Sequence, residues 1–233
     1  MPKICILGSG SWGTAQALLL SSKEFQVILW GRIEDGVDSL QQDRENRRFL
    51  PGIRLSDTIV ATSDLARALK GADIVVMAVP SQSLREVLEK ARPYLGKDSC
   101  LVNTAKGLEI SSGMRMSQVV EDVLGKQSRE RYAVLSGPSH AEEVARNIPT
   151  AITVASYHKE NAFLVQDLYM TPFFRVYTNP DVAGVELGGA LKNIIALGTG
   201  IASGLGYGDN TQAALLTRGL HEIIRMGEAM GGE

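Results

Sequence analysis

The chain has 233 residues, of which 44% are hydrophobic, 21% charged and 6% aromatic, a composition typical of a packed globular protein. Its 24 Lys and Arg residues are balanced by 26 Asp and Glu residues, so there is no basic excess for general nucleic-acid binding. Two cysteines cannot build a disulfide scaffold, and three scattered histidines form no metal set. We therefore expect a soluble, cytoplasmic protein without a metal site.

Strand-length apolar runs alternate with helical patterns through most of the chain. The expected strands are 3–7, 26–30, 58–61, 73–79, 99–103, 133–136 and 150–155, and the expected helices are 12–22, 65–69, 82–91, 114–124, 141–147 and 160–169. Several strands are apolar throughout, as in strands that are buried on both faces. The alternation predicts an α/β fold with a doubly wound parallel sheet and helices on both sides.

The pattern changes after Asn179-Pro180, where two long helical stretches replace the strands. We expect a first domain at 1–180 and the beginning of an all-helical domain at 181–233. The apolar stretch 188–207 is interrupted by Lys192 and is too short for a membrane span, which needs roughly 20 apolar residues. It is interpreted as a buried helix. So short a helical domain has few partners of its own, so we expect it to pack against another subunit or against further chain.

Gly8-Ser9-Gly10-Ser11-Trp12-Gly13 is a G-x-G-x-x-G motif between the first strand and the first helix. In this position the motif is typical of a Rossmann-like dinucleotide site, although a purely structural turn is the alternative. Gly8 permits the tight turn, Gly10 lets a pyrophosphate approach the backbone, and Gly13 lets the helix pack closely on the strand. The helix N-terminus then favours the anion.

Arg32 follows the second strand, where an NAD-selective site usually has an acidic residue. A guanidinium suits the 2′-phosphate of NADP, whereas Glu34 and Asp35 lie further along the chain. The alternative is a solvated arginine that stacks on adenine. We predict NADP as the cofactor, with NAD also accepted.

Other polar residues lie where further strands are expected to end, the usual side for ligands in such a sheet. Lys106 precedes a glycine and could hold a phosphate or an alkoxide there, although a solvated surface lysine is the alternative. Lys192 stands in a glycine-rich helix that is apolar on almost every side. A lysine in such a helix must reach out, pair or line a cavity, so we predict that it exchanges a proton with a carbonyl oxygen.

Together, GSGSWGTA, VPSQ, NTAKGLE, SGPSHAEEVA and VELGGALKNIIALGTGIASGLGYGDNTQAALLTRGL resemble the bacterial NAD(P)-dependent glycerol-3-phosphate dehydrogenases. The resemblance runs from Lys3 to about Gly231, and AKG with ELGGALKN is its most specific part. It implies reversible reduction of dihydroxyacetone phosphate to sn-glycerol 3-phosphate, a precursor of phospholipids. It also implies a homodimer or larger assembly, and chains longer than this one with further substrate-holding residues.

The resemblance also implies roles for individual residues. The cofactor would be contacted by Ser11, Trp12, Arg32, Phe49, Lys106 and Ala141, in addition to the glycine loop. The substrate would be held by Lys106, Gly137, Ser139 and Lys192, and Lys192 would be the proton donor and acceptor.

Two other functions remain as alternatives. Gly137-Pro138-Ser139-His140-Ala141 nearly matches the nucleophile elbow of serine hydrolases, with Asp181 or Asp209 and then His221 in the matching chain order. However, Ala141 replaces the last glycine. A non-catalytic, NADP-binding redox sensor is the second alternative, and it leaves Lys192 without a role.

Overall fold

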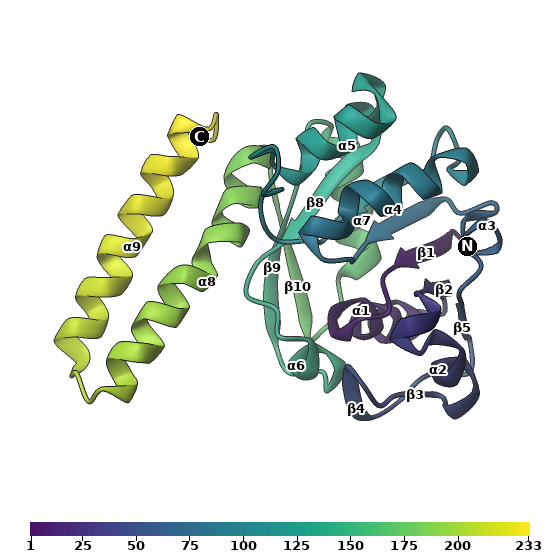
Figure 1. Cartoon of the computed structure of the whole chain (residues 1–233), viewed down its shortest axis with the longest axis horizontal. Helices are drawn as coiled ribbons and strands as arrows, with labels where there is room; N and C mark the ends of the chain where they lie inside the picture. The colour runs from purple at the N-terminus through teal and green to yellow at the C-terminus, as the bar shows by residue number, and fades with distance from the viewer.

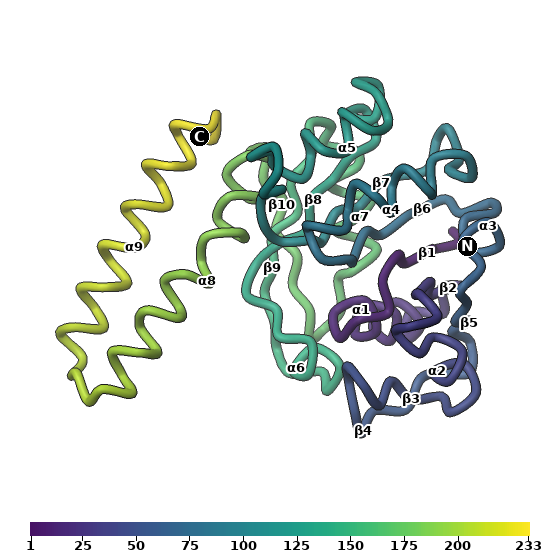
Figure 2. Tube along the Cα trace, viewed as in Figure 1, coloured from purple at the N-terminus to yellow at the C-terminus, as the bar shows by residue number.

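A computed structural model describes residues 1–233 and shows an α/β body from which a two-helix arm extends (Figure 1). The arm consists of α8 (Val182–Gly204) and α9 (Asp209–Ala229). The two helices pack on each other along their lengths, and their far ends lie well away from the sheet (Figure 2).

The body is built on an eight-stranded sheet with the strand order β10-β9-β8-β7-β6-β1-β2-β5. The strands are β1 (Lys3–Leu7), β2 (Gln26–Trp30), β5 (Ile59–Thr62), β6 (Ile74–Met77), β7 (Cys100–Asn103), β8 (Tyr132–Ser136), β9 (Thr150–Ser156) and β10 (Phe174–Asn179). The predicted doubly wound α/β fold is confirmed. The prediction of a wholly parallel sheet is wrong at one pair, because β9 runs antiparallel to β8.

Helices cover both faces of the sheet. They are α1 (Ser11–Ser21), α2 (Val37–Asp43), α3 (Leu65–Leu69), α4 (Leu84–Ala91), α5 (Met116–Leu124), α6 (Ala141–Ala145) and α7 (Lys159–Tyr169). Alternate residues of β1 enter different cores: Ile4 and Ile6 pack with α1, α6 and α7, whereas Cys5 and Leu7 pack with α3, α4 and α5. This double burial explains why the strand is apolar at each position after Lys3.

Three elements were not predicted from the sequence: β10, helix α2, and a small antiparallel hairpin formed by β3 (Glu45–Asn46) and β4 (Leu50–Arg54). The sequence of β10 alternates, with Phe174 and Val176 buried and Arg175 and Tyr177 exposed. Such a half-buried edge strand lacks the continuous apolar run by which the other strands were recognised.

The expectation that 188–207 forms a buried helix is wrong for most of the segment. The start of α8 is buried at Val182 and Leu187, but the side chains of Ile194 and Leu197 are 63% and 67% exposed. Further along, α8 lies beside α9 and away from the sheet (Figure 1), and apolar side chains such as Ile201 also remain exposed. No helix of the structure is both long enough and apolar enough to cross a membrane.

Candidate functional site

The glycine loop joins the end of β1 to the start of α1, and two of its glycines are required by the packing of the protein itself. Gly8 has a φ of +120°, and a Cβ there would lie 2.7 Å from the carbonyl oxygen of Ala78. A Cβ on Gly13 would lie 1.9 Å from the carbonyl oxygen of Gly8. These glycines set the turn and the close approach of α1 to the loop.

Gly10 is different, because a Cβ there would meet no atom within 4 Å. Protein packing therefore does not explain this glycine, whereas a ligand lying against the loop does. Two buried polar atoms beside it, Ser9 Oγ and Trp12 Nε1, have no hydrogen-bond partner. The phosphates of a dinucleotide can lie against the backbone at Gly10, accept hydrogen bonds from the unpaired polar atoms and be stabilised by the N-terminus of α1.

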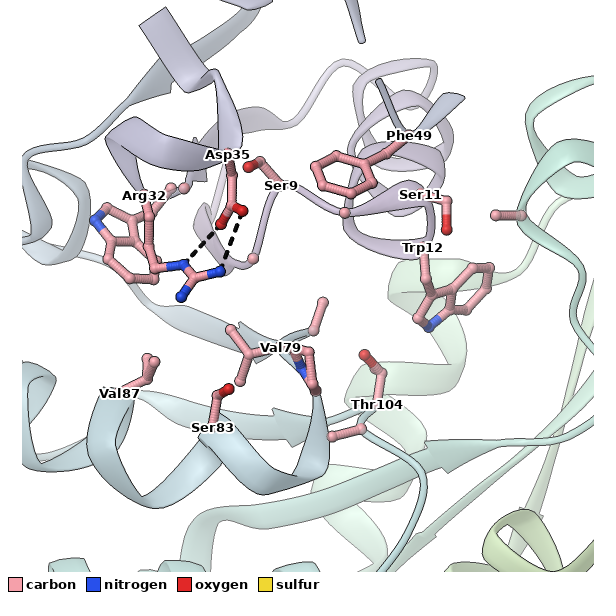
Figure 3. Close-up of a pocket in the computed structure, with 18 of the residues that line it drawn as sticks. Ser9, Ser11, Trp12, Arg32, Asp35, Phe49, Val79, Ser83, Val87 and Thr104 are labelled. Atoms are coloured by element: carbon pink, nitrogen blue, oxygen red, sulfur yellow. Dashed lines mark hydrogen bonds and ion pairs between the residues drawn. The ribbon is translucent and has the colours of Figure 1, made fainter. Parts of the chain in front are cut away.

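The loop opens into a cleft of about 950 Å³ along the carboxyl ends of several strands. Figure 3 shows Ser9, Ser11, Trp12 and Phe49 on one side of it, and Val79, Ser83, Val87 and Thr104 on the other. The cleft lining includes these residues predicted to bind the cofactor: Gly8, Gly10, Ser11, Trp12, Arg32, Phe49, Lys106 and Ala141. Gly13, Gly137 and Lys192 are outside this lining.

Arg32 lies at the cleft, just after β2, and is held by an acidic neighbour. Its Nε donates to Asp35 Oδ2 at 2.8 Å and its Nη2 donates to Asp35 Oδ1 at 3.1 Å (Figure 3). Glu34 Oε1 lies 3.4 Å from the same Nε. The hydrogen bond to Asp35 raises the pKa of Arg32, so the guanidinium stays charged.

The β3–β4 hairpin brings Phe49 to the cleft, and a buried asparagine attaches the hairpin to the glycine loop. Asn46 Nδ2 donates to the Ser9 carbonyl oxygen at 2.8 Å and to Thr14 Oγ1 at 2.7 Å. The Arg48 guanidinium lies 4.9 Å from the centre of the Phe49 ring. The sequence pattern does not single out Asn46 or Arg48, because the hairpin that positions them carries only a weak strand pattern.

Lys106 contacts two of the other residues predicted to bind the substrate. Its Nζ donates to the Gly137 carbonyl oxygen at 3.0 Å and to Ser139 Oγ at 3.2 Å, and it lies 6.0 Å from the centre of the Trp12 ring. Burial, and then the nearby charge of Lys192, lower the pKa of Lys106 to about 8. Two positively charged side chains therefore lie near the end of the cleft next to Trp12, and an anion bound there would reduce the repulsion between them.

α8 approaches this end of the cleft through a glycine. A Cβ on Gly189 would lie 2.1 Å from Ser136 Oγ and 4.0 Å from Lys106 Cγ, so only glycine allows the helix to come so close. Ser136 Oγ is buried without a partner. Lys192 follows on the same helix, half-buried, with its Nζ 2.8 Å from Asn193 Oδ1. Close packing at Gly189 thus brings Lys192 to the side of the cleft that holds Lys106.

The geometry does not support the serine hydrolase alternative. Ser139 Oγ contacts Lys106 and the Gly137 carbonyl oxygen rather than a histidine. His140 is exposed and lies 3.1 Å from Glu142, and Asp181 caps α8 by accepting from Gly184 N. A nucleophilic serine needs a base within hydrogen-bond reach, and none of the predicted partners supplies one.

Comparison with known families bears on the two functions that remain, a dehydrogenase and a non-catalytic redox sensor. A model described as the N-terminus of NAD-dependent glycerol-3-phosphate dehydrogenase matches residues 3–162, and the corresponding C-terminus model matches residues 181–233. The chain belongs to the NAD-dependent glycerol-3-phosphate dehydrogenase family. The family predicted from the sequence motifs is thereby confirmed.

Individual members of this family are similar along nearly the whole chain. A glycerol-3-phosphate dehydrogenase (NAD(P)+) of Carboxydothermus hydrogenoformans is 53% identical over 231 residues, which are 99% of this chain and 68% of the relative. One from Pelotomaculum thermopropionicum is 57% identical over 98% of this chain and 66% of its own length. This chain therefore spans about two thirds of these dehydrogenases.

Solved structures give the same result. The 2.1 Å crystal structure of glycerol-3-phosphate dehydrogenase from Coxiella burnetii has a TM-score of 0.92 and 40% identity, covering 100% of this chain and 70% of that one. The Dunaliella salina enzyme has a TM-score of 0.88 and 28% identity, covering 99% and 42% of the two chains. A ketopantoate reductase from Ralstonia eutropha, at 17% identity and a TM-score of 0.67, shares the fold alone.

Proposed function

We propose that this protein catalyses the reversible NAD(P)H-dependent reduction of dihydroxyacetone phosphate to sn-glycerol 3-phosphate. The observation that carries the proposal is the position of Lys106, which lies in the lining of the dinucleotide cleft and donates to Gly137 and Ser139, while the helix that bears Lys192 packs beside it at Gly189. Two neighbouring ammonium groups match the two anionic features of this reaction, a phosphate group and a developing alkoxide. A redox sensor has no need for such a pair.

The glycine loop, Ser11 and Trp12 hold the dinucleotide, with its phosphates at the N-terminus of α1. Phe49 and Ala141 close the cleft around it, and Arg32 lies where the adenine-side ribose is expected. When bound, the nicotinamide supplies the hydride. We propose NADP as the cofactor, with NAD also used, because Arg32 occupies the place of the acidic residue that selects NAD.

Lys106, Gly137 and Ser139 hold the substrate phosphate. Lys106 Nζ donates to Ser139 Oγ at 3.2 Å, so the ammonium and the hydroxyl lie close enough together to bind the same phosphate. A phosphate there accepts a charge-assisted hydrogen bond from Lys106 and a second bond from Ser139. The anion also offsets the repulsion between the two lysines.

Lys192 is the proton donor and acceptor. In the reductive direction its ammonium polarises the substrate carbonyl and passes a proton to the oxygen as that oxygen becomes an alkoxide. In the reverse direction the neutral amine takes the hydroxyl proton. Asn193, which accepts from Lys192 Nζ, orients the ammonium in the absence of substrate.

The further proposals concern assembly and location. We propose a homodimer, supported by the uncovered apolar side chains of α8, such as Ile194, Leu197 and Ile201, and we expect sedimentation of the purified protein to give twice the chain mass. We also propose the cytoplasm as its location, because the unpaired Cys5 and Cys100 are typical of a reducing compartment.

Dehydrogenase activity is tested by following the absorbance of NADPH and of NADH when dihydroxyacetone phosphate is added. We expect oxidation of the nucleotide with dihydroxyacetone phosphate but only slow oxidation with unphosphorylated dihydroxyacetone, because Lys106 and Ser139 need a phosphate. A protein that binds NADPH yet oxidises it with neither compound contradicts the dehydrogenase and supports the redox sensor.

A further inference from the structure

The surroundings of Arg32 limit how well this arginine can attract an anion. Its guanidinium donates from Nε and Nη2 to both carboxylate oxygens of Asp35, so the edge of the guanidinium that carries these two donors is occupied. Glu34 lies 3.4 Å away as a second carboxylate. One cation thus faces two anions at this end of the cleft, which leaves the group with a net negative charge.

Of the two nearby cations in the cleft lining, one is paired with a carboxylate, and the other keeps its charge but contacts a backbone carbonyl and an aromatic ring. Lys90 Nζ lies 2.6 Å from Glu86 Oε1 on α4, so its charge is already paired. Arg48 Nη1 donates to the Glu34 carbonyl oxygen at 2.7 Å, and its guanidinium lies over Phe49. Of these cations, only Arg32 stands directly after β2, where the adenine-side ribose is expected.

A short 3-10 helix, Ile33–Asp35, explains why this carboxylate and not another reaches Arg32. The helix turns the chain back at once after Arg32, which places Asp35 three residues later on the same side. Asp38, the next carboxylate along the chain, is exposed and makes no ion pair. The Arg32–Asp35 contact therefore depends on the fold of this turn as well as on closeness in sequence.

We propose that Asp35 is a specificity-determining residue that sets the ratio of NADH to NADPH affinity through its ion pair with Arg32. To bind a 2′-phosphate, Arg32 has to share or leave Asp35, and the phosphate has to approach a second negative charge. A 2′-hydroxyl requires neither. Asp35 thus weakens NADPH binding relative to NADH binding and lets one site accept both. This inference rests on the proposed dinucleotide-binding function.

The test compares Asp35→Asn, which keeps the shape of the side chain and removes its charge, with Asp38→Asn as the matched control. Asp38→Asn removes the same charge three residues later without touching Arg32. The chain has two tryptophans, Trp12 and Trp30, and both line the cleft. Quenching of their fluorescence therefore measures the Kd of NADPH, NADH, 2′,5′-ADP and 5′-AMP without relying on turnover.

We expect Asp35→Asn to strengthen the binding of NADPH and 2′,5′-ADP relative to NADH and 5′-AMP by about twofold to fivefold, the upper part of the range for loss of a competing exposed ion pair. Asp38→Asn should change this ratio by less than about twofold. A ratio unchanged in Asp35→Asn, or shifted toward NADH, overturns the inference, the latter because Asp35 would then be orienting Arg32 for the phosphate. Failure of the unmodified protein to bind any of these nucleotides instead overturns the proposed function.

Discussion

The Glu186 carboxylate of α8 lies 2.8 Å from the Arg115 guanidinium at the start of α5, and both groups are largely buried. The carboxylate also accepts from Ser117 N and Oγ, each at 2.7 Å, and from the Tyr132 hydroxyl at 2.6 Å. Burial and the charge of Glu186 raise the pKa of Tyr132 well above its usual value, so its hydroxyl remains a donor. Glu186 thus accepts from Arg115, Ser117 and Tyr132, while Arg115 Nε is left without a partner. These contacts fix α8 to the sheet where the arm begins.

Glu186→Ala should lower the free energy of unfolding by about 3–5 kcal/mol, the cost of leaving a buried ion-pair partner unmatched. Because Glu186 stands six residues before Lys192 on α8, turnover should fall as well. Urea unfolding measures the first effect, with Glu89→Ala on the exposed face of α4 as the control. A loss below about 1 kcal/mol, the size of an exposed pair, would show that this network does not hold α8.

Lys192→Met removes the ammonium and keeps the aliphatic stem, so the protein should fold and still quench its tryptophan fluorescence with NADPH. Its kcat should fall by at least about a hundredfold, because general acid catalysis contributes 10²–10⁴-fold. Lys97→Met, at an exposed position far from the cleft lining, is the control. Near-normal kcat in Lys192→Met would make Lys192 a structural lysine.

The pH dependence of substrate binding should report Lys106. Its pKa is lowered to about 8, so the group is an ammonium below that pH and becomes a neutral amine above it. The KM for dihydroxyacetone phosphate should therefore be nearly constant between about pH 6, where the substrate phosphate itself titrates, and about pH 7, and rise about tenfold per pH unit above about pH 8. Lys106→Arg, which stays charged throughout, should abolish the rise. A profile that is the same for both proteins would assign the titration to another group.

Arg32→Asp should weaken NADPH binding far more than NADH binding, through loss of one charge-assisted contact of roughly 1.5–3 kcal/mol. That energy corresponds to about a tenfold to hundredfold change in the Kd of NADPH. The measurement is tryptophan quenching, with Arg175→Asp on the exposed side of β10 as the control. Equal losses for both cofactors would mean that Arg32 contacts a part of the dinucleotide that they share.

The two buried thiols should be unreactive in the native protein. Burial raises the pKa of Cys5 to about 12 and that of Cys100 to about 11, so almost no thiolate is present at neutral pH. Alkylation by iodoacetamide should occur only after unfolding, because the thiolate is the reactive form. Rapid labelling of folded protein at pH 7, read by mass spectrometry, would contradict their burial.

The sequence by itself determined the α/β class, the glycine loop and most strands, because these depend on patterns within a few neighbouring residues. β1 and β2 have the predicted bounds, 3–7 and 26–30, since burial on both faces requires a continuous apolar run, which here follows one polar residue at the start of each strand. The family was likewise readable from local motifs such as ELGGALKN.

Only the tertiary structure decided how distant segments meet. The reversed direction of β9, the contact of Lys106 with Ser139 and the Glu186–Arg115 pair each join residues far apart in the chain. No local periodicity specifies such partners, because they depend on how whole elements pack. The same holds for the exposed face of α8: its apolar sequence predicts burial, but burial requires a neighbouring element, and the far part of α8 lies beside α9 and away from the sheet (Figure 1).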